Sequence, residues 1–275
     1  MPDRYAVIGN PVAHSKSPLI HAEFARQCGQ DISYSALPAP LDGFKEVVLK
    51  FRDEGGKGVN VTVPFKQAAW HLVHAYSGYA LAAGAVNTIE FRDSEIIGHN
   101  TDGIGLVRDI KNNLKREFAG KRVLLMGAGG ASYGVMEPLL REQPEQLVVA
   151  NRTLGKAISL VGHFEKFQRF AVRGVSARPY DGLENAQFDI VINATSAGLS
   201  DAMPPLPAGV FSFGALAYDM VYGRRTPFLE FARTRGASAV DGTGMLVEQA
   251  AESFFIWRGV RPETGPVIAM LRSEK

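Results

Sequence analysis

Two charged residues lie near the starts of predicted helices, and one of them, Lys66, is placed where it could act in proton transfer. Lys66 lies at the start of a helix predicted from residue 65 to about residue 76, and Asp102 precedes a helix that begins at Gly103. A cation in the first helical turn faces the positive end of the helix dipole, which favours release of the Lys66 proton. A lysine so placed suits acid or base catalysis near neutral pH. Position alone, however, favours simpler roles: a solvated lysine and an aspartate that caps its helix.

Two serines precede the first predicted helix. Ser17, followed by Pro18, forms a typical helix start, so Ser17 is predicted to be the N-cap, and Gly29 is a plausible end. Capping explains Ser17 but leaves unexplained why Ser15 offers a second hydroxyl two residues earlier.

Amides and hydroxyls also interrupt apolar segments. In the strand predicted at residues 58–63, Asn60 and Thr62 alternate with valines and therefore point to the opposite face. Asn87 is first interpreted as a turn or strand-end residue. Gln249 lies beside the apolar face of the closing helix, where a side-chain amide needs a hydrogen-bond partner.

No metal site is predicted. His71 and His74 are spaced for one helical face, but no third ligand is near, and a surface position is the better interpretation. The order of residues typical of a serine hydrolase and the Cys-x-x-Cys pair are both missing from the sequence.

The segment 122–153 has the features of a dinucleotide-binding βαβ unit. A buried strand at residues 123–126 ends in a glycine-rich turn, a helix follows from Ala131, and a second strand covers residues 147–150. Glycine lets the backbone approach a pyrophosphate, and the helix N-terminus supplies N–H groups. Ser132 stands where a third glycine or alanine is usual, Pro138 should kink or shorten the helix, and an ordinary βα turn is the alternative for the loop alone.

The end of the second strand indicates which dinucleotide would bind. NAD-binding units usually carry an acidic residue here for the ribose 2′-hydroxyl. This chain has Asn151, Arg152 and Thr153, with Lys156 close behind. A guanidinium and an ammonium suit a 2′-phosphate, so NADP(H) is predicted rather than NAD(H).

Alternating helices and strands predict an α/β protein of two domains. The first α/β domain spans residues 1–102 and the Rossmann-type domain residues 103–240, with residues 100–103 as the hinge between them. Residues 241–275 follow the second domain. Other predicted elements are an amphipathic helix with apolar residues from 41 to 51, a long connecting helix with apolar residues from 104 to 118, strands at 170–175 and 215–221, and a closing helix at 244–258.

Composition limits the class of protein. The 275 residues are 46% hydrophobic and 21% charged, with a formal net charge of +2, so nothing indicates a nucleic-acid or membrane partner. The single cysteine, Cys28, excludes an internal disulfide and fits a reducing compartment. No membrane span or signal peptide is visible. We expect a cytoplasmic protein, and leave monomer and homodimer open.

Nine motifs in order resemble those of one family, the shikimate dehydrogenases. Any one of them could arise by chance, but the ordered set is specific and covers nearly the whole chain. They lie at residues 9–18 (GNPVAHSKSP), 60–66 (NVTVPFK), 84–88 (GAVNT), 100–103 (NTDG), 127–132 (GAGGAS), 151–153 (NRT), 193–196 (NATS), 218–222 (YDMVY) and 241–246 (DGTGML).

The resemblance implies reversible, NADPH-dependent reduction of 3-dehydroshikimate to shikimate by an enzyme of two α/β domains with a cleft between them. It also implies that the last helices, in residues 241–275, pack on the first, substrate-binding domain. It implies Lys66 and Asp102 as the catalytic pair, with Lys66 as acid and base. The implied substrate residues are Ser15, Ser17, Thr62, Lys66, Asn87, Asp102, Tyr222 and Gln249. The implied NADP residues are Gly127, Ala128, Gly129, Gly130 and Ala131 at the pyrophosphate, Asn151, Arg152, Thr153 and Lys156 at the 2′-phosphate, and Met220 and Gly242 near the nicotinamide.

Some positions depart from the family pattern. Tyr133 and Lys156 stand where arginine is common, and Gly78 with Tyr79 replaces a frequent Glu-Arg pair. These departures bear on cofactor affinity and preference rather than on the fold.

Three other functions are alternatives to this one. The nearest is a related enzyme that acts on quinate with NAD; Arg152 argues against NAD, and Ser17 against quinate, because quinate-preferring relatives tend to have threonine there. A non-catalytic NADP-binding regulator would not need Lys66 with Asp102. A methyltransferase would need an acidic residue where Arg152 stands.

Overall fold

The protein, described by a computed structural model over residues 1–165, 174–195 and 202–273, is divided into two compact units. The first contains Met1–Gly105 and the residues from Val247 onward, and the second contains Leu106–Leu246. These divisions fall a few residues beyond the predicted domain limits at residues 102 and 240. The functions predicted for the two domains stay predictions.

The first unit is built on a six-stranded mixed sheet with the order β2-β1-β3-β5-β6-β4. Strands β1, β2 and β3 run parallel, β5 pairs antiparallel with both β3 and β6, and β4 runs parallel to β6. The strands are β1 Asp3–Gly9, β2 Ile32–Pro38, β3 Gly56–Val61, β4 Ala75–Tyr76, β5 Thr88–Arg92 and β6 Glu95–His99.

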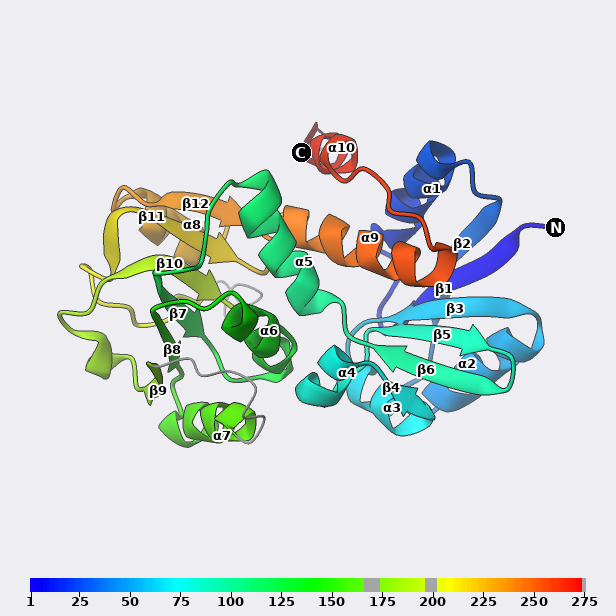
Figure 1. Ribbon diagram of the computed structural model, residues 1–275, viewed down its shortest axis with the longest axis horizontal. Coiled ribbons are helices and arrows are strands. Elements are labelled where there is room, and N and C mark those ends of the chain that lie inside the picture. The colour runs from blue at the N-terminus through cyan, green and yellow to red at the C-terminus, as the bar shows by residue number, and fades with distance from the viewer. Residues whose placement is uncertain (166–173, 196–201, 274–275) are drawn as a thin grey trace. The chain divides into compact units, whose positions relative to one another are not determined.

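Side-chain alternation along the strands gives this sheet two apolar faces. Ala6 and Ile8 of β1 join a core with helices α2 and α3, whereas Tyr5 stacks on Trp257 of α9 with ring centroids 4.7 Å apart. Figure 1 shows α2 and α3 on one side of the strands and α1 and α9 on the other. The helices are α1 Ser17–Cys28, α2 Phe44–Asp53, α3 Lys66–Leu72, α4 Gly78–Ala83, α9 Thr243–Arg258 and α10 Gly265–Ser273.

The closing helix α9 is joined to the first unit by specific contacts. Trp257 Nε1 donates a hydrogen bond to the carbonyl of Ile89 at 3.1 Å, and Arg258 pairs with Asp3 at 2.5 Å. Gly58 permits this contact, since a Cβ there would lie 2.4 Å from Trp257 Nε1. The C-terminal residues therefore return to the first unit, as the sequence predicted.

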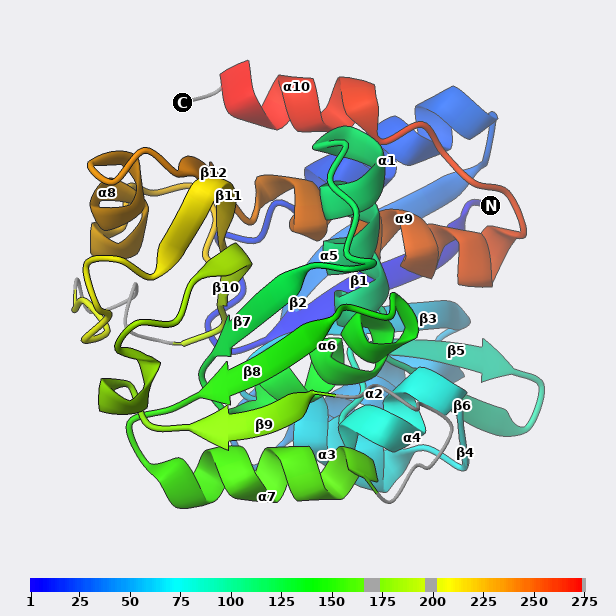
Figure 2. The ribbon, with the colours of Figure 1, turned by 60° about the vertical axis from the view of Figure 1, so that its left-hand side comes forward.

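The second unit contains a six-stranded parallel sheet with the order β12-β11-β10-β7-β8-β9, and Figure 2 shows its strands side by side. Read from the other edge, this is the 3-2-1-4-5-6 order of a Rossmann fold. Its strands are β7 Arg122–Met126, β8 Gln146–Ala150, β9 Val175–Arg178, β10 Phe188–Asn193, β11 Phe211–Asp219 and β12 Ser238–Asp241. The predicted α/β fold class is confirmed.

Helices α6 Gly130–Arg141 and α7 Leu154–Glu165 connect β7, β8 and β9, and α8 Pro227–Arg233 connects β11 to β12. The single 3₁₀ turn Asp181–Leu183 precedes β10. Helix α6 continues through Pro138 to Arg141. No helix in the described part of the chain is both long and apolar enough to cross a bilayer.

Three helix predictions were wrong at their ends. Leu41 lies before α2 and is 73% exposed. Helix α3 ends at Leu72 because Val73 is extended and Ala75–Tyr76 pairs with β6. The connecting helix α5 Asp102–Arg108 runs on as a π-helical turn, Asp109–Asn113, and stops there. Phe118 is fully buried but outside the helix, so its apolar spacing reflected tertiary packing rather than helical periodicity.

Two strand predictions also differ from the structure. The strand predicted at 170–175 is observed as Val175–Arg178, and residues 170–173 lie outside the described residues. The strand predicted at 215–221 is observed as Phe211–Asp219. Elements α4, β4, β12 and α10 were not predicted, since most are short and none carries a strong periodic pattern.

Candidate active site

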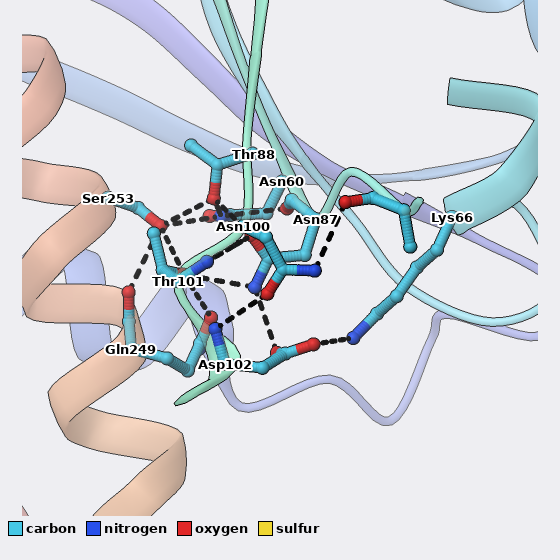
Figure 3. Close-up of polar contacts among 10 residues, drawn as sticks. Asn60, Lys66, Asn87, Thr88, Asn100, Thr101, Asp102, Gln249 and Ser253 are labelled. Carbon is cyan, nitrogen blue, oxygen red and sulfur yellow. Dashed lines mark hydrogen bonds and ion pairs between the residues drawn. The ribbon is translucent and has the colours of Figure 1, made fainter. Parts of the chain in front are cut away.

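Lys66 and Asp102 form an ion pair in the first unit. Each is the first residue of its helix, α3 and α5 respectively, and Lys66 Nζ lies 2.5 Å from Asp102 Oδ2. The Lys66 side chain is 31% exposed and that of Asp102 is 12% exposed, so the pair is accessible from the lysine side. Figure 3 shows Lys66 reaching Asp102 from the side opposite to Gln249 and Ser253 of α9.

Asn87 fixes the other oxygen of Asp102. Its Oδ1 accepts a hydrogen bond from the backbone N–H of Thr101 at 3.0 Å. Because a backbone N–H can only donate, this contact determines which end of the amide carries the oxygen. Its Nδ2 therefore faces Asp102 and donates to Oδ1 at 2.8 Å. One carboxylate oxygen is held by Asn87 and the other faces Lys66.

Asp102 does not act as the N-cap of its helix. It is the first residue of α5, and its own N–H donates to Asn100 Oδ1 at 3.2 Å. Asn100 in turn donates from Nδ2 to the carbonyl of Ala85 at 3.1 Å. Asn100 thus satisfies the helix start, and the carboxylate of Asp102 remains available to Asn87 and Lys66.

Gln249 joins the same cluster from α9. Its Oε1 accepts a hydrogen bond from Thr101 Oγ1 at 3.4 Å, and Thr101 Oγ1 also accepts from Asn87 Nδ2 at 2.9 Å. The partner that the sequence required for this amide is therefore Thr101. Gln249, Asn87, Asp102 and Lys66 are brought together by segments far apart in the chain.

The predicted cap of α1 is wrong. Lys16 is the N-cap residue and Ser17 is the first helical residue. Ser15 Oγ accepts a hydrogen bond from the Ser17 N–H at 3.2 Å, so the hydroxyl that capping left unexplained is the one that contacts the helix start. Ser17 itself is buried beside Tyr34; burial raises the pKa of the Tyr34 phenol well above its usual value, and a hydrogen bond from Ser17 partly offsets this.

Thr62 follows β3 and packs closely on β1. Its N–H donates to the carbonyl of Ile8 at 2.9 Å, and a Cβ at Gly9 would lie 2.4 Å from Thr62 Cγ2. Gly9, the first residue of the motif at residues 9–18, is therefore required by its contact with Thr62 of the motif at residues 60–66.

Sequence reasoning missed four polar residues that support this cluster. Asn60, Thr88, Thr101 and Ser253 are all buried and all hydrogen-bonded to one another or to Asn87. The available signal was the presence of a polar residue in an otherwise apolar strand or helix, as at Asn60 and Ser253. That signal marks a buried polar residue but does not identify its partner.

The glycine-rich turn of the second unit lies at the carboxyl end of β7. Gly127 has φ +100°, and a Cβ there would lie 3.2 Å from the carbonyl oxygen of Ala194, which follows β10. Ser132 is fully buried, and its Oγ donates to the carbonyl of Gly127 at 2.9 Å. The hydroxyl at the third fingerprint position therefore closes the turn.

The rest of the turn is open. Gly129, Gly130 and Ala131 are exposed, and a Cβ added at either glycine would meet no atom within 4 Å. Ala128 is half-buried between them and Gly127. Helix α6 begins at Gly130 and points its N-terminal amides at this turn. A pyrophosphate fits both the space and the positive end of the helix.

The cationic turn after β8 is held by its own backbone. Asn151 Nδ2 donates to the carbonyl of Thr153 at 2.9 Å, which leaves Arg152 and Lys156 exposed. Among the residues that the structure describes, neither cation pairs with a carboxylate. Burial raises the pKa of Tyr180 to about 12, and the positive charge of nearby Arg152 partly opposes this shift. The turn offers free cations and no acidic residue, which fits a 2′-phosphate.

Met220 and Gly242 are adjacent at the ends of β11 and β12. A Cβ at Gly242 would lie 2.5 Å from the carbonyl oxygen of Met220, and Gly242 N donates to Val221 at 3.1 Å. Asp219 is buried and accepts hydrogen bonds from the Val221 N–H and the Thr226 hydroxyl; burial raises its pKa. Tyr222, 41% exposed, follows in the same loop of the second unit. Residues 196–198 of the loop after β10 lie outside the described residues.

Sheet order, glycine turn and unpaired cations define a dinucleotide-binding α/β protein whose first unit carries the Lys66–Asp102 ion pair. The sequence matches the shikimate dehydrogenase substrate binding domain over residues 7–89, the shikimate / quinate 5-dehydrogenase domain over residues 109–200, and the shikimate 5′-dehydrogenase C-terminal domain over residues 242–272.

Relatives that match over nearly the whole chain support the same family. Shikimate dehydrogenase (NADP(+)) of Nitrosospira multiformis is 60% identical over 99% of this chain and 98% of its own. An Ael1 enzyme from Pseudomonas putida has a crystal structure with 48% identity and a TM-score of 0.91, covering 98% of each chain. The Thermus thermophilus shikimate 5-dehydrogenase, in complex with NADP(H) and shikimate, is 32% identical with a TM-score of 0.86, covering 99% of this chain and 100% of that one. The chain belongs to the shikimate dehydrogenase family.

Proposed function

We propose that this protein is an NADP-dependent oxidoreductase that interconverts 3-dehydroshikimate and shikimate. The observation that carries the proposal is the Lys66–Asp102 pair, held by Asn87 in the unit that matches the family's substrate binding domain. The relative of 60% identity bears the name of this activity. The reaction would serve the biosynthesis of chorismate and the aromatic amino acids.

Reduction of a ketone to an alcohol needs one hydride at carbon and one proton at oxygen. NADPH supplies the hydride when bound. The Lys66 ammonium would donate the proton to the carbonyl oxygen, and the same group would accept it in the reverse direction. Asp102 would keep the ammonium in place and, with Asn87 and Gln249, would bind the substrate's hydroxyl groups.

Neutral hydroxyls would bind the substrate carboxylate. Ser15, Ser17 and Thr62 belong to the first unit and lie on or next to β3 and α1. Hydroxyl donors orient a carboxylate without adding a cation that would compete with Lys66 for Asp102. Tyr222 of the second unit would complete the substrate shell.

The second unit would hold NADP(H). The open turn would bind the pyrophosphate through Gly127, Ala128, Gly129, Gly130 and Ala131. The exposed turn after β8 would bind the 2′-phosphate through Asn151, Arg152, Thr153 and Lys156, with Arg152 able to form two parallel hydrogen bonds. Met220 and Gly242 would lie near the nicotinamide.

Four initial-rate assays test the proposal: shikimate and quinate, each with NADP⁺ and with NAD⁺. We expect the shikimate–NADP⁺ pair to give the highest kcat/KM by at least about tenfold, the equivalent of one charge-assisted contact. A preference for quinate with NAD⁺ would support the alternative enzyme. NADPH binding without turnover in any assay would support a non-catalytic regulator.

The remaining expectations are part of the same proposal. A biosynthetic reductase that uses NADPH would work in the cytoplasm, and it would act as a monomer or a homodimer. Cell fractionation and size-exclusion chromatography with light scattering would measure these two properties.

A further inference from the structure

Three buried polar side chains connect helix α9 to strands β3 and β5. Ser253 of α9 and Thr88 of β5 are fully buried, and Asn60 of β3 is 6% exposed. Asn60 Nδ2 lies 2.9 Å from Ser253 Oγ and 3.0 Å from Thr88 Oγ1, and the two hydroxyl oxygens are 2.8 Å apart. Figure 3 shows Ser253 and Thr88 on the far side of Asn87 from Lys66.

The orientation of Asn60 is fixed by its neighbours. Its Nδ2 lies 3.3 Å from the carbonyl of Asn87, which can only accept. The opposite end, Oδ1, accepts from the Tyr34 hydroxyl at 2.7 Å. Asn60 therefore donates from Nδ2, and its two hydrogens are shared among the Asn87 carbonyl, Ser253 Oγ and Thr88 Oγ1.

The hydrogen bonds donated by these hydroxyls can form a series that runs from Ser253 toward the Lys66–Asp102 pair. Ser253 Oγ can donate to Thr88 Oγ1 or to the carbonyl of Gln249, one helical turn back, at 3.1 Å. Thr88 Oγ1 lies 2.9 Å from Asn87 Oδ1. When Ser253 donates to Thr88, Thr88 donates to Asn87, and Asn87 donates to Asp102. This series of donors ends on the carboxylate that faces Lys66, and such series strengthen each member by polarisation.

We propose that Ser253 is a positioning residue for the Lys66–Asp102 pair, acting through Thr88 and Asn87. The inference rests on the proposed function and adds to it a residue that does not touch the substrate. Packing alone does not require a hydroxyl here, since the neighbouring α9 residues Ala250 and Phe254 are fully buried and apolar. Without the hydroxyl, the amide of Asn60 loses a buried acceptor, and Thr88 Oγ1, which donates to Asn87, loses its hydrogen-bond partner in α9.

Ser253 also links the position of α9 along its axis to both Gln249 and Thr101. Its oxygen contacts the backbone of Gln249, whose side chain reaches Thr101. Thr101 Oγ1 lies 3.5 Å from Ser253 Oγ as well. A shift of α9 along its axis would therefore disturb Gln249 and Asn87 together.

The test compares Ser253→Ala with wild type on shikimate and NADP⁺. We expect a fall in kcat of about tenfold, the fold-change that one buried hydrogen bond represents, with the NADP⁺ KM within about twofold of wild type. The pH profile of kcat should also shift, because the surroundings of the proton-transfer group have changed. A kcat within about twofold of wild type and an unshifted profile would overturn the proposal.

Thr88 provides a matched pair of variants should Ser253→Ala fold poorly. Thr88→Val removes the hydroxyl with nearly the same volume, and Thr88→Ser keeps it. We expect Thr88→Val to match Ser253→Ala, the double variant Ser253→Ala/Thr88→Val to be no worse than either single variant, and Thr88→Ser to retain most of the activity. Equal losses in Thr88→Val and Thr88→Ser, or additive losses in the double variant, would contradict a shared pathway.

Val48→Ala is the stability control. Val48 is fully buried in α2 in the apolar core of the same unit and has no polar contact. Val48→Ala should lower the melting temperature without changing the pH profile. If the profile shifts in Val48→Ala as it does in Ser253→Ala, the effect of Ser253 is one of general stability, and the proposal is overturned.

If the wild type turns over none of the substrates, the proposed function fails by itself. Crystal structures of wild type and Thr88→Val then decide the positioning role by whether Asn87 Nδ2 moves away from Asp102 Oδ1.

Discussion

Asn87 Nδ2 donates to Asp102 Oδ1 at 2.8 Å, and this bond settles which carboxylate oxygen faces Lys66. The neutral amide of Asn87 holds one carboxylate oxygen, and the other oxygen faces the ammonium of Lys66. The lysine is thereby oriented without being fully enclosed, because 31% of its side chain is exposed. The arrangement suits a group that must exchange a proton with a bound substrate.

Replacing Lys66 should remove the proton donor while leaving the fold and the NADPH site in place. We expect Lys66→Ala to lower kcat by at least about 10²-fold, the usual scale for a general acid–base group, with NADPH affinity unchanged by fluorescence titration. The exposed Lys57 of β3 offers a control, since Lys57→Ala removes a charge from the same unit without touching the site. A near-normal kcat in Lys66→Ala would exclude Lys66 from the chemistry.

Arg152 should determine the preference for NADP. A charge-assisted hydrogen bond is worth about 1.5–3 kcal/mol, so Arg152→Ala should raise the NADP⁺ KM about 10- to 100-fold and leave the NAD⁺ KM nearly unchanged. Exposed Lys156 can take over part of the phosphate, which favours the lower end. Both cofactors are measured at one ionic strength, with Lys121→Ala as a surface-charge control. A parallel rise in both KM values would mean that Arg152 supports the loop instead.

Ser132 should affect both cofactors alike, because it closes the glycine turn rather than binding the phosphate. Its buried hydroxyl bonds to Gly127, so Ser132→Ala should cost about 1 kcal/mol of unfolding free energy and raise the NADP⁺ and NAD⁺ KM values by similar factors. Ser159→Ala removes an exposed hydroxyl bond of the same length to Gly155 and should change neither. Urea unfolding and initial rates measure both effects, and a rise confined to NADP⁺ would contradict this role.

His21 should make the first unit sensitive to acid. It is fully buried, stacked on Tyr34 with ring centroids 4.2 Å apart, and burial lowers its pKa to about 3. The unfolded chain binds a proton at His21 near the usual pKa of 6.5, whereas the folded chain does not. The free energy of unfolding is therefore not reduced by His21 above pH 6.5, and it is reduced progressively as the pH falls toward 3. At pH 5 this group alone would remove roughly 2 kcal/mol, at about 1.4 kcal/mol per pH unit.

The His21 effect can be separated from that of the carboxylates by comparing variants. The free energy of unfolding at pH 7.5 and pH 5.0 should differ less in His21→Phe than in wild type. The variant His71→Gln, which replaces an exposed histidine, should keep the wild-type difference. Equal pH dependence in His21→Phe and wild type would show that His21 is not responsible.

The nucleotide-binding unit was the part best predicted from sequence. Its strand, glycine turn, helix and second strand follow one another within 122–153, so their spacing along the chain encodes their contacts directly. Arg152 is placed by the same local logic, at the end of the second strand. Even here the reason for Ser132 became visible only when its hydroxyl was found on the Gly127 carbonyl.

The residues of the Lys66–Asp102 pair were named from the sequence one by one, but their arrangement was not predicted. Lys66 and Asp102 are 36 residues apart, and position alone favoured a surface lysine and a capping aspartate. Their meeting depends on the pairing of β3, β5 and β6, which places the starts of α3 and α5 side by side. The predicted N-cap of α1 was wrong for a related reason. Only in the folded turn before α1 does Ser15, and not Ser17, accept a hydrogen bond from the helix start.

What the sequence determined by itself was the α/β class, the Rossmann unit and the place of Arg152 and Lys156 after its second strand, because helix and strand periods and turn residues act over a few neighbouring positions. What only the tertiary structure decided was the polar cluster around Asn87. Ser253 meets Asn60 across 193 residues, and a buried hydroxyl or amide signals only that it needs a partner. The partner is chosen by strand pairing and helix packing, which bring distant segments to one point.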